Sequence, residues 1–244
     1  MEKEEIIEKL RDDENYYGDF GKQYLSNSDI PALLRNPLAF KEYMGMTTAF
    51  LVGGYFHTAI LEPAKLKKYR IIEASTRATK KYKEISDGEM CLLQHEVDHI
   101  ELMQDRLLGN DVCNHLIRNG DIEYEVPNVT NIGGNMWKGK ADIVNHDDRM
   151  IIDLKTTGNI SAFRSSAYKY NYDSQAYIYT QLFKGYDFTF VVIDKTTLQI
   201  GVYDCSSSFY QSGQEKVEQA NLNYDLFFKL GDTDPKQFLT TETL

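Results

Sequence analysis

Two carboxylates and a lysine stand close together in the middle of the chain, in a pattern suited to hydrolysis. Asp142 follows Gly-Lys-Ala, and only Leu154 separates Asp153 from Lys155. If the two segments are neighbouring strands, Asp142 and Asp153 converge, and the backbone carbonyl of Leu154 adds a third oxygen ligand. Mg²⁺ and Mn²⁺ prefer such all-oxygen sites. We therefore predict a divalent metal site at Asp142, Asp153 and Leu154.

Lys155 is the candidate for the chemistry itself. Residues two apart on a strand share a face, so its ammonium stands beside Asp153 and the expected metal. There it can orient or deprotonate a water molecule, or stabilise charge that develops on phosphorus. A carboxylate-x-Lys triple is weak evidence alone, and Asp234-Pro-Lys236 repeats it in a turn-like context. The alternative for Asp153 and Lys155 is an ion pair at a strand end.

Gln175 and Tyr179 form a second feature, four residues apart on an expected helix. Side chains at this spacing share one helix face. An amide and a phenol together can hold a phosphate and a base edge or sugar. The alternative is an ordinary amphipathic surface.

His57 and Glu123 are further candidates for the metal site. His57 follows Gly53-Gly54 on an apolar helix, where paired glycines suggest a close backbone approach. Its neutral imidazole is a candidate metal ligand, and the alternative is a hydrogen-bonded core histidine. Glu123 can supply another carboxylate from the first strand, with Glu125 as a rival on the same face.

The elements that must position these residues alternate in type along the chain. We expect helices at 1–14, 28–44 (two, broken near Asn36-Pro37), 47–62, 87–108, 110–119, 159–169, 171–184 and 206–230. We expect strands at 121–130, 135–146, 149–155, 187–195 and 198–204. This order predicts an α/β fold with a mixed central sheet flanked by helices and preceded by a helical region. We expect residues 1–244 to form a single domain, with 1–119 mainly helical and 120–230 as the α/β catalytic core.

The charge and composition limit the classes of partner. A net charge of −10 argues against sequence-independent coating of a polyanion. The basic run 65–83 is either a docking segment for phosphates or a solvated, mobile surface, and the sequence leaves both open. The sequence contains no stretch of about 18 apolar residues, so we expect no membrane span. The three scattered cysteines and the absence of a secretory signal favour the cytoplasm.

Taken together, these motifs resemble the PD-(D/E)XK nuclease superfamily, and within it the exonuclease VIII (RecE-like) group of phages and prophages. The resemblance covers roughly residues 24–230. It rests on five short blocks in a specific order: Ser26–Phe40, Gly53–Pro63, Gly139–Asp142, Ile152–Thr157 and Gln175–Tyr179. The Gly-Lys-Ala before Asp142 departs from the Gly-Arg-Pro of many relatives.

The resemblance implies a role for each matched residue. His57, Asp142 and Asp153 would be metal ligands and Lys155 the catalytic lysine. Gln175 and Tyr179 would match the Gln-x-x-x-Tyr motif of the group, and Glu123 a further acidic position. Enzymes of this group degrade one strand of linear duplex DNA from its 5′ end and leave a 3′ overhang for recombination. They often form rings and act beside a single-strand annealing protein.

We therefore expect a Mg²⁺- or Mn²⁺-dependent exonuclease that acts on ends of double-stranded DNA in the cytoplasm of a bacterial host. Two alternatives remain open. The first is an endonuclease of the same fold, and the second is a DNA-binding module without catalytic activity.

Overall fold

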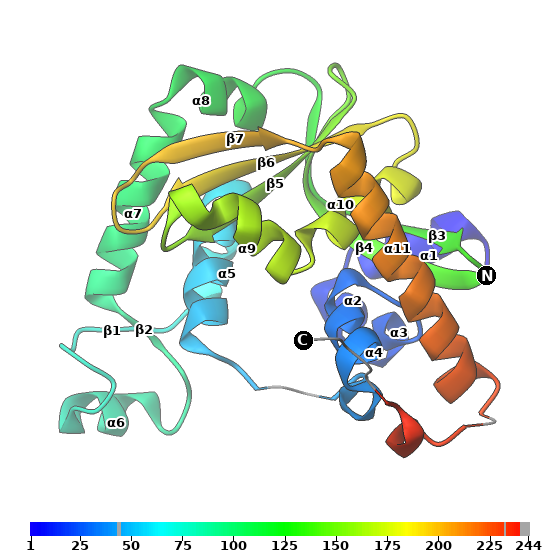
Figure 1. Ribbon diagram of the computed structural model, residues 1–244. Coiled ribbons are helices and arrows are strands. Elements are labelled where there is room, and N and C mark those ends of the chain that lie inside the picture. The colour runs from blue at the N-terminus through cyan, green and yellow to red at the C-terminus, as the bar shows by residue number, and fades with distance from the viewer. Residues whose placement is uncertain (43–44, 232, 240–244) are drawn as a thin grey trace.

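A five-stranded mixed sheet lies at the centre of the computed structural model, which describes residues 1–42, 45–231 and 233–239 (Figure 1). The strand order is β3-β4-β5-β6-β7, with β5 and β6 parallel and the other neighbours antiparallel. The strands are β3 (Ile122–Ile132), β4 (Asn135–Asn145), β5 (Met150–Thr157), β6 (Asp187–Asp194) and β7 (Ile200–Asp204). The predicted mixed α/β fold is confirmed.

Alternating apolar side chains bury both faces of the central strands. Ile151 and Phe190 point into the core on one face, whereas Ile152, Leu154 and Val191 point into the core on the other. A strand buried on both faces reads as a nearly continuous apolar run, as β5 and β6 do. Polar residues at the ends of these strands therefore stand out, and Asp153 and Lys155 are among them.

Helices from distant parts of the chain cover the two faces (Figure 1). One face packs against helices from the first half of the chain, and the other mainly against helices that follow β5. The first group is α5 (Thr48–Leu61), α7 (Gln94–Leu108) and α8 (Asp111–Arg118). The second is α9 (Phe163–Lys169), α10 (Tyr172–Leu182) and α11 (Ser207–Tyr224), joined by α4 (Ile30–Arg35). The helical first half thus packs directly on the sheet.

The N-terminal segment packs against β3 as three short helices. They are α1 (Lys3–Leu10), α2 (Asp13–Tyr17) and α3 (Asp19–Lys22). Ile6, Leu10 and Tyr16 bury their side chains with Val129 of β3. The predicted single helix over 1–14 is wrong, because the Asp12 side chain accepts a hydrogen bond from the Asn15 N–H at 3.0 Å and starts a new helix there.

The predicted long helix over 87–108 begins only at Gln94. Residues 87–91 form a turn and loop instead, and Leu92–Leu93 form β2, which pairs in parallel with β1 (Ile71–Ile72). The Glu96 side chain accepts a hydrogen bond from the Leu93 N–H at 2.9 Å and so caps α7. A further helix, α6 (Lys80–Ser86), was not expected.

Two other boundaries also differ from the expected ones. After α4, the expected second helix of 28–44 is a 3₁₀ turn over Pro37–Ala39, and residues 43–44 lie outside the described residues. The closing helix ends as a π-turn over Asp225–Lys229.

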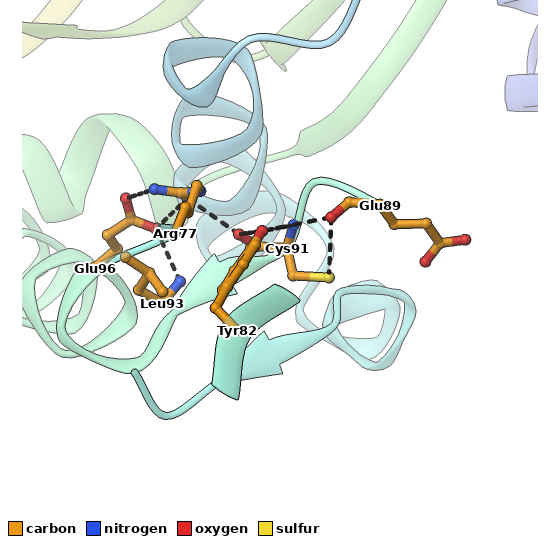
Figure 2. A network of polar contacts seen from close by, with 6 residues as sticks. All are labelled: Arg77, Tyr82, Glu89, Cys91, Leu93 and Glu96. Atoms are coloured by element: carbon orange, nitrogen blue, oxygen red, sulfur yellow. Dashed lines mark hydrogen bonds and ion pairs between the residues drawn. The ribbon is translucent and has the colours of Figure 1, made fainter. Parts of the chain in front are cut away.

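The basic run 65–83 folds around β1, β2 and α6, and ion pairs hold many of its charges. Figure 2 shows Arg77 against Glu96, with Nη1 and Nη2 donating to the two carboxylate oxygens at 2.8 and 2.7 Å. Beside it, the Tyr82 hydroxyl accepts a hydrogen bond from the Cys91 N–H at 2.7 Å. The run is therefore folded but mostly exposed, and many of its cations pair with carboxylates of the protein itself. Among the described residues, no helix is long and apolar enough to cross a membrane.

Candidate active site

The candidate site lies where β4 and β5 separate. Their pairing runs from Asn145–Met150 to Ile143–Ile152 and stops there. The next residue of each strand is an aspartate, Asp142 on β4 and Asp153 on β5. The Asp142 Oδ2 accepts a hydrogen bond from the Leu154 N–H at 2.8 Å, in place of a backbone partner. The divergence of the two strands therefore brings both carboxylates to one place, as the sequence predicted.

Asp153 is only 3 % exposed and makes two side-chain contacts. Its Oδ1 accepts a hydrogen bond from Gln175 Nε2 of α10 at 2.6 Å. Its Oδ2 contacts the Lys155 ammonium, yet this buried oxygen accepts no hydrogen bond of normal geometry. Asp153, Lys155 and Gln175 thus form one group, as expected.

His57 reaches the same place from α5. Its Nδ1 lies 3.2 Å from Asp142 Oδ2. The expected close approach at the two glycines is limited, because a Cβ at Gly53 would meet no atom within 4 Å and one at Gly54 would lie 3.3 Å from the Tyr69 hydroxyl. His57 therefore contacts the Asp142 carboxylate, and its role as a metal ligand stays a prediction.

Glu125, and not Glu123, lies beside Asp142. The strand pairs Tyr124–Ile143 and Val126–Ala141 flank Glu125 and Asp142, which places them opposite one another. Glu125 also has a φ of 52°, a strained conformation for a residue with a Cβ.

Glu123 faces a different neighbourhood at the outer end of β3. Its Oε1 lies 2.9 Å from His146 Nε2, and its Oε2 lies 3.9 Å from Arg11 Nη2. The structure therefore does not bring Glu123 to the cluster. The rival carboxylate of Glu125 occupies the expected place.

Tyr179 contacts β4 rather than the open side of the site. Its hydroxyl accepts a hydrogen bond from the Lys140 N–H at 3.1 Å and donates one to the Lys140 carbonyl at 2.8 Å. The ring packs so closely on Gly139 that a Cβ there would lie 3.0 Å from two ring atoms and 2.6 Å from Leu182 Cδ1. Tyr179 thus fixes the strand that carries Asp142.

The charges in the site shift one another's pKa values in opposite directions. Burial alone would raise the pKa of Asp142, but His57, Lys155 and the Leu154 N–H lower it. Burial and the neighbouring Asp142 raise the pKa of Asp153 despite Lys155. The pKa values of two carboxylates that share a site move apart in this way, because two negative charges close together repel each other.

The other titratable groups respond to the same carboxylates. Burial, and then the negative charge of Asp142, raises the pKa of Glu125 to about 7. Burial would lower the pKa values of Lys155 and His57, but nearby aspartates raise both above their usual values. The site therefore holds more negative charge than its own cations balance.

The residues fit a divalent cation. Asp142, Asp153 and Glu125 offer carboxylate oxygens, and the Lys155 ammonium is the side chain that contacts the buried Oδ2 of Asp153. Hard cations such as Mg²⁺ bind oxygen donors of this kind. Within residues 1–42, 45–231 and 233–239, no three His, Cys, Asp or Glu side chains are already arranged to hold a metal ion. The carboxylate oxygens are held instead by His57, Lys155 and Gln175.

The N-terminal segment contributes contacts beside the site that the sequence did not reveal. Asp13 of α2 accepts a hydrogen bond from Lys140 Nζ at 2.6 Å and another from Lys65 Nζ at 3.3 Å. Lys155 also lies over the Tyr172 ring, 4.9 Å from its centroid. No local pattern pointed to Asp13 or Tyr172, whereas the register of β3 against β4 could have favoured Glu125 over Glu123.

Comparison with known proteins agrees with this geometry. Residues 36–236 match the sequence profile of the family described as "PDDEXK-like domain of unknown function (DUF3799)". No curated protein matches the chain. A solved structure named "Putative exonuclease", from Eubacterium rectale, is 17 % identical, with a TM-score of 0.69 over 96 % of this chain and 95 % of that one.

A phage-related exonuclease from Haemophilus somnus 129PT is 16 % identical over 85 % of this chain and 96 % of that one, with a TM-score of only 0.38. The first of these two similarities supports the fold, and the second is too loose for a comparison of positions. Nucleases of the PDDEXK-like fold generally use divalent metal ions. Because the family profile covers most of its length, the chain belongs to the PDDEXK-like family DUF3799, and its expected kinship with the PD-(D/E)XK nucleases is confirmed.

Proposed function

We propose that the protein is a Mg²⁺- or Mn²⁺-dependent exonuclease that hydrolyses phosphodiester bonds at the ends of linear double-stranded DNA. One observation carries the proposal: Asp142, Asp153, Lys155 and Gln175 meet where two strands diverge, and the Lys155 ammonium contacts a buried carboxylate oxygen of Asp153. Carboxylates that can hold a metal ion beside an ammonium suit metal-assisted hydrolysis of a phosphate ester.

Each residue has a role that its contacts support. Asp142, Asp153 and the Leu154 carbonyl would hold the ion, with His57 or Glu125 as a further ligand. When bound, the ion would polarise the phosphate and lower the pKa of the attacking water. Lys155 would orient that water and stabilise the negative charge that develops on the phosphate oxygens.

The two α10 residues have different tasks in this proposal. Gln175 holds Asp153 in place through its amide and presents the remaining part of that amide to the DNA strand. Tyr179 acts indirectly, because its hydroxyl is hydrogen-bonded to the backbone of β4. It is therefore a positioning residue, and it was expected to touch DNA directly.

The finer features of the activity rest on the resemblance to the exonuclease VIII group. They are 5′ to 3′ polarity, a 3′ overhang used in recombination, a ring-shaped homo-oligomer, a single-strand annealing partner and action in the cytoplasm of a phage-carrying bacterium. The single domain over residues 1–244 is likewise part of the proposal, supported by helices from both halves of the chain that pack on the same sheet.

Digestion of linear duplex DNA with Mg²⁺ tests the proposal. Asp153→Ala and Lys155→Ala should each reduce the rate at least 100-fold, because each removes a group that acts on the reacting phosphate. Lys236→Ala is a matched control from the second carboxylate-x-Lys triple, where Asp234 accepts a hydrogen bond from the Lys236 N–H at a turn. Equal rates for wild type and both site variants would reject the assignment.

Covalently closed circular DNA separates the proposed exonuclease from an endonuclease of the same fold. An exonuclease needs an end, so closed circles should persist under conditions that degrade the same DNA after linearisation. Cleavage of both forms at similar rates would favour the endonuclease. Absence of hydrolysis, with binding of DNA retained, would favour a non-catalytic module.

A further inference from the structure

A pocket of about 380 Å³ opens directly beyond the last residues of β5, next to Lys155. Such a volume lies within the range of small-ligand sites, about 300–1,000 Å³. Of its residues, only Tyr172 was named above, as the ring beneath the Lys155 ammonium. The lining residues come from the end of β5 and the loop after it, from α9, from the residues before and at the start of α10, and from the loop after β6. They are Thr156, Thr157, Gly158, Asn159, Ser166, Tyr170, Tyr172 and Lys195.

Hydrogen bonds fix the two loops that contribute lining residues to this pocket. Asp194, at the end of β6, accepts hydrogen bonds from the Ile160 N–H at 2.8 Å and the Thr197 N–H at 3.0 Å. The Lys195 N–H donates to the Thr157 carbonyl at 2.8 Å. The loops that follow β5 and β6 are thus tied together, and the main chain of Lys195 is fixed.

Several polar side chains of the pocket have no partner in the part of the chain that the structure describes. The Lys195 ammonium makes no ion pair there, although many of the other lysines and arginines described above are paired with a carboxylate. The hydroxyls of Thr156 and Ser166 also lack hydrogen-bond partners among the described residues. A cation beside two hydroxyls is a suitable environment for a phosphate group.

Aromatic rings complete the pocket and connect it with Lys155. Tyr170 is 57 % exposed, a large fraction for a ring that lines a pocket. The Tyr170 ring centroid lies 6.2 Å from that of Tyr172, and the Lys155 ammonium lies over the Tyr172 ring. A flat base can stack on an exposed tyrosine, whatever its sequence, because every base has a π face.

We propose that this pocket binds one nucleotide of the DNA strand next to the bond that is cut. The base stacks on Tyr170, and the phosphate of that nucleotide contacts Lys195, Thr156 and Ser166. This inference rests on the proposed nuclease function, and it names the residues that would hold the strand beside the metal. The adjoining Lys155 then acts on the neighbouring phosphate.

Binding of short oligothymidylates tests the pocket without hydrolysis. The anisotropy of a 3′-labelled oligonucleotide is measured in EDTA, so that no metal-dependent step occurs. Lys195→Gln and Tyr170→Ala should each raise the Kd about tenfold, a typical loss for one phosphate contact or one stacked base. Tyr170→Phe should bind as the parent does, because the ring remains and only the hydroxyl is lost.

Lys184→Gln is the matched control for Lys195→Gln. Lys184 is an exposed lysine before β6, whereas Lys195 follows β6, and the eight residues of that strand separate them by about 26 Å. Its substitution removes the same charge from the other edge of the sheet. Equal weakening by both variants would show general attraction to phosphates and would overturn the pocket assignment.

Oligonucleotides with and without a 5′-phosphate identify which phosphate the pocket takes. If Lys195→Gln weakens only the phosphorylated form, the ligand is a terminal phosphate, and if it weakens both, the ligand is an internal phosphodiester. Each result supports the pocket. No binding by the parent protein, or binding unchanged by Lys195→Gln and Tyr170→Ala, would overturn it.

The same variants distinguish this inference from the proposed function. If the protein degrades linear DNA and Lys195→Gln leaves the KM for that DNA unchanged, only the pocket assignment fails. If the protein degrades no DNA but the pocket variants still weaken oligonucleotide binding, the hydrolytic proposal fails and the nucleotide site remains.

Discussion

At the scale of single residues, the site concentrates negative charge that the protein alone does not neutralise. Asp142 and Asp153 share the positive charges of His57 and Lys155, and Glu125 adds a third carboxylate opposite Asp142. A buried group held in an unfavourable charge state reduces the stability of the folded protein. The same arrangement favours a divalent cation, so stability and function should oppose one another here.

Glu125→Gln should therefore stabilise the metal-free protein at high pH. The folded protein holds the Glu125 proton up to a pKa of about 7, whereas the unfolded chain releases it near 4.5. The unfolded state thus binds fewer protons between these values, and stability falls as the pH rises from 4.5 to 7. In EDTA at pH 8 the variant should be more stable than wild type by about 3 kcal/mol, since the pKa rises from 4.5 to about 7 and one pKa unit corresponds to about 1.4 kcal/mol.

Urea unfolding of both proteins at pH 4.5 and pH 8 measures this effect. The advantage of the variant should be small at pH 4.5, where wild-type Glu125 is protonated in the folded state. An advantage of the same size at both pH values would show that the charge of Glu125 is not its cause.

Gln175→Ala tests the residue that holds Asp153. The amide donates to Asp153 Oδ1 at 2.6 Å, and loss of a partner that orients a metal-binding carboxylate typically reduces activity 10- to 100-fold. We expect kcat on linear DNA to fall by about that factor. Gln181→Ala, on the same helix but away from Asp153, should leave kcat within about twofold of wild type.

At the scale of elements, the site depends on how closely α10 and the N-terminal helices pack on β4. Tyr179 binds the backbone of Lys140, whose ammonium is held from the other side by Asp13. β4 is thus fixed from both faces just before Asp142. Changes on either face should alter the position of that aspartate.

Gly139→Ala should separate α10 from β4. The added Cβ would lie 2.6 Å from Leu182 Cδ1 and 3.0 Å from two atoms of the Tyr179 ring. Overpacking of this kind destabilises by about 1–3 kcal/mol. Thermal unfolding should therefore show a lower Tm, and digestion of linear DNA should slow.

Gly53→Ala provides the matched comparison for that variant. Its Cβ would meet no atom within 4 Å, and alanine favours a helix by about 1 kcal/mol over glycine. Its Tm should stay constant or rise. If Gly139→Ala behaves in the same way, the close packing of α10 on β4 is not needed.

Asp13→Asn tests the contact from the N-terminal helices. The Lys140 side chain is only 6 % exposed, so it would lose the carboxylate that balances its buried charge. Leaving a buried donor without its partner costs about 1–3 kcal/mol. Urea unfolding should show this loss, whereas Asp19→Asn, which breaks an exposed pair with Lys22, should change stability by less than about 0.5 kcal/mol. Similar losses in both variants would contradict the role of Asp13.

At the scale of the whole molecule, the sequence predicted the features that depend on local pattern. The apolar runs of β5 and β6 and the turn after β4 were sufficient to predict the central strands and the meeting of Asp142 with Asp153. The position of Gln175 could be predicted in the same way, because α10 lies between β5 and β6 in the chain. The N-terminal boundary of α7 could not be predicted from local pattern, because Leu92 and Leu93 pair with a distant strand.

The remaining features of the site arise from packing between distant segments. Asp13 and Lys140 are separated by 127 residues, so no local pattern links them. The choice of Glu125 over Glu123 depends on the register of β3 and on a positive φ that periodicity does not encode. Tyr179 sits on the expected helix face, but its hydroxyl meets the backbone of β4, which only the close approach at Gly139 allows.

Titration calorimetry with Mn²⁺ tests the central claim most directly, because it reports the ion and its ligands without DNA. Wild type and the control Asp234→Asn should both show saturable heat from specific binding, and Asp142→Asn and Asp153→Asn should each abolish it or weaken the affinity at least tenfold. Identical binding isotherms in all four proteins, or no specific heat in wild type, would contradict a divalent ion held between β4 and β5.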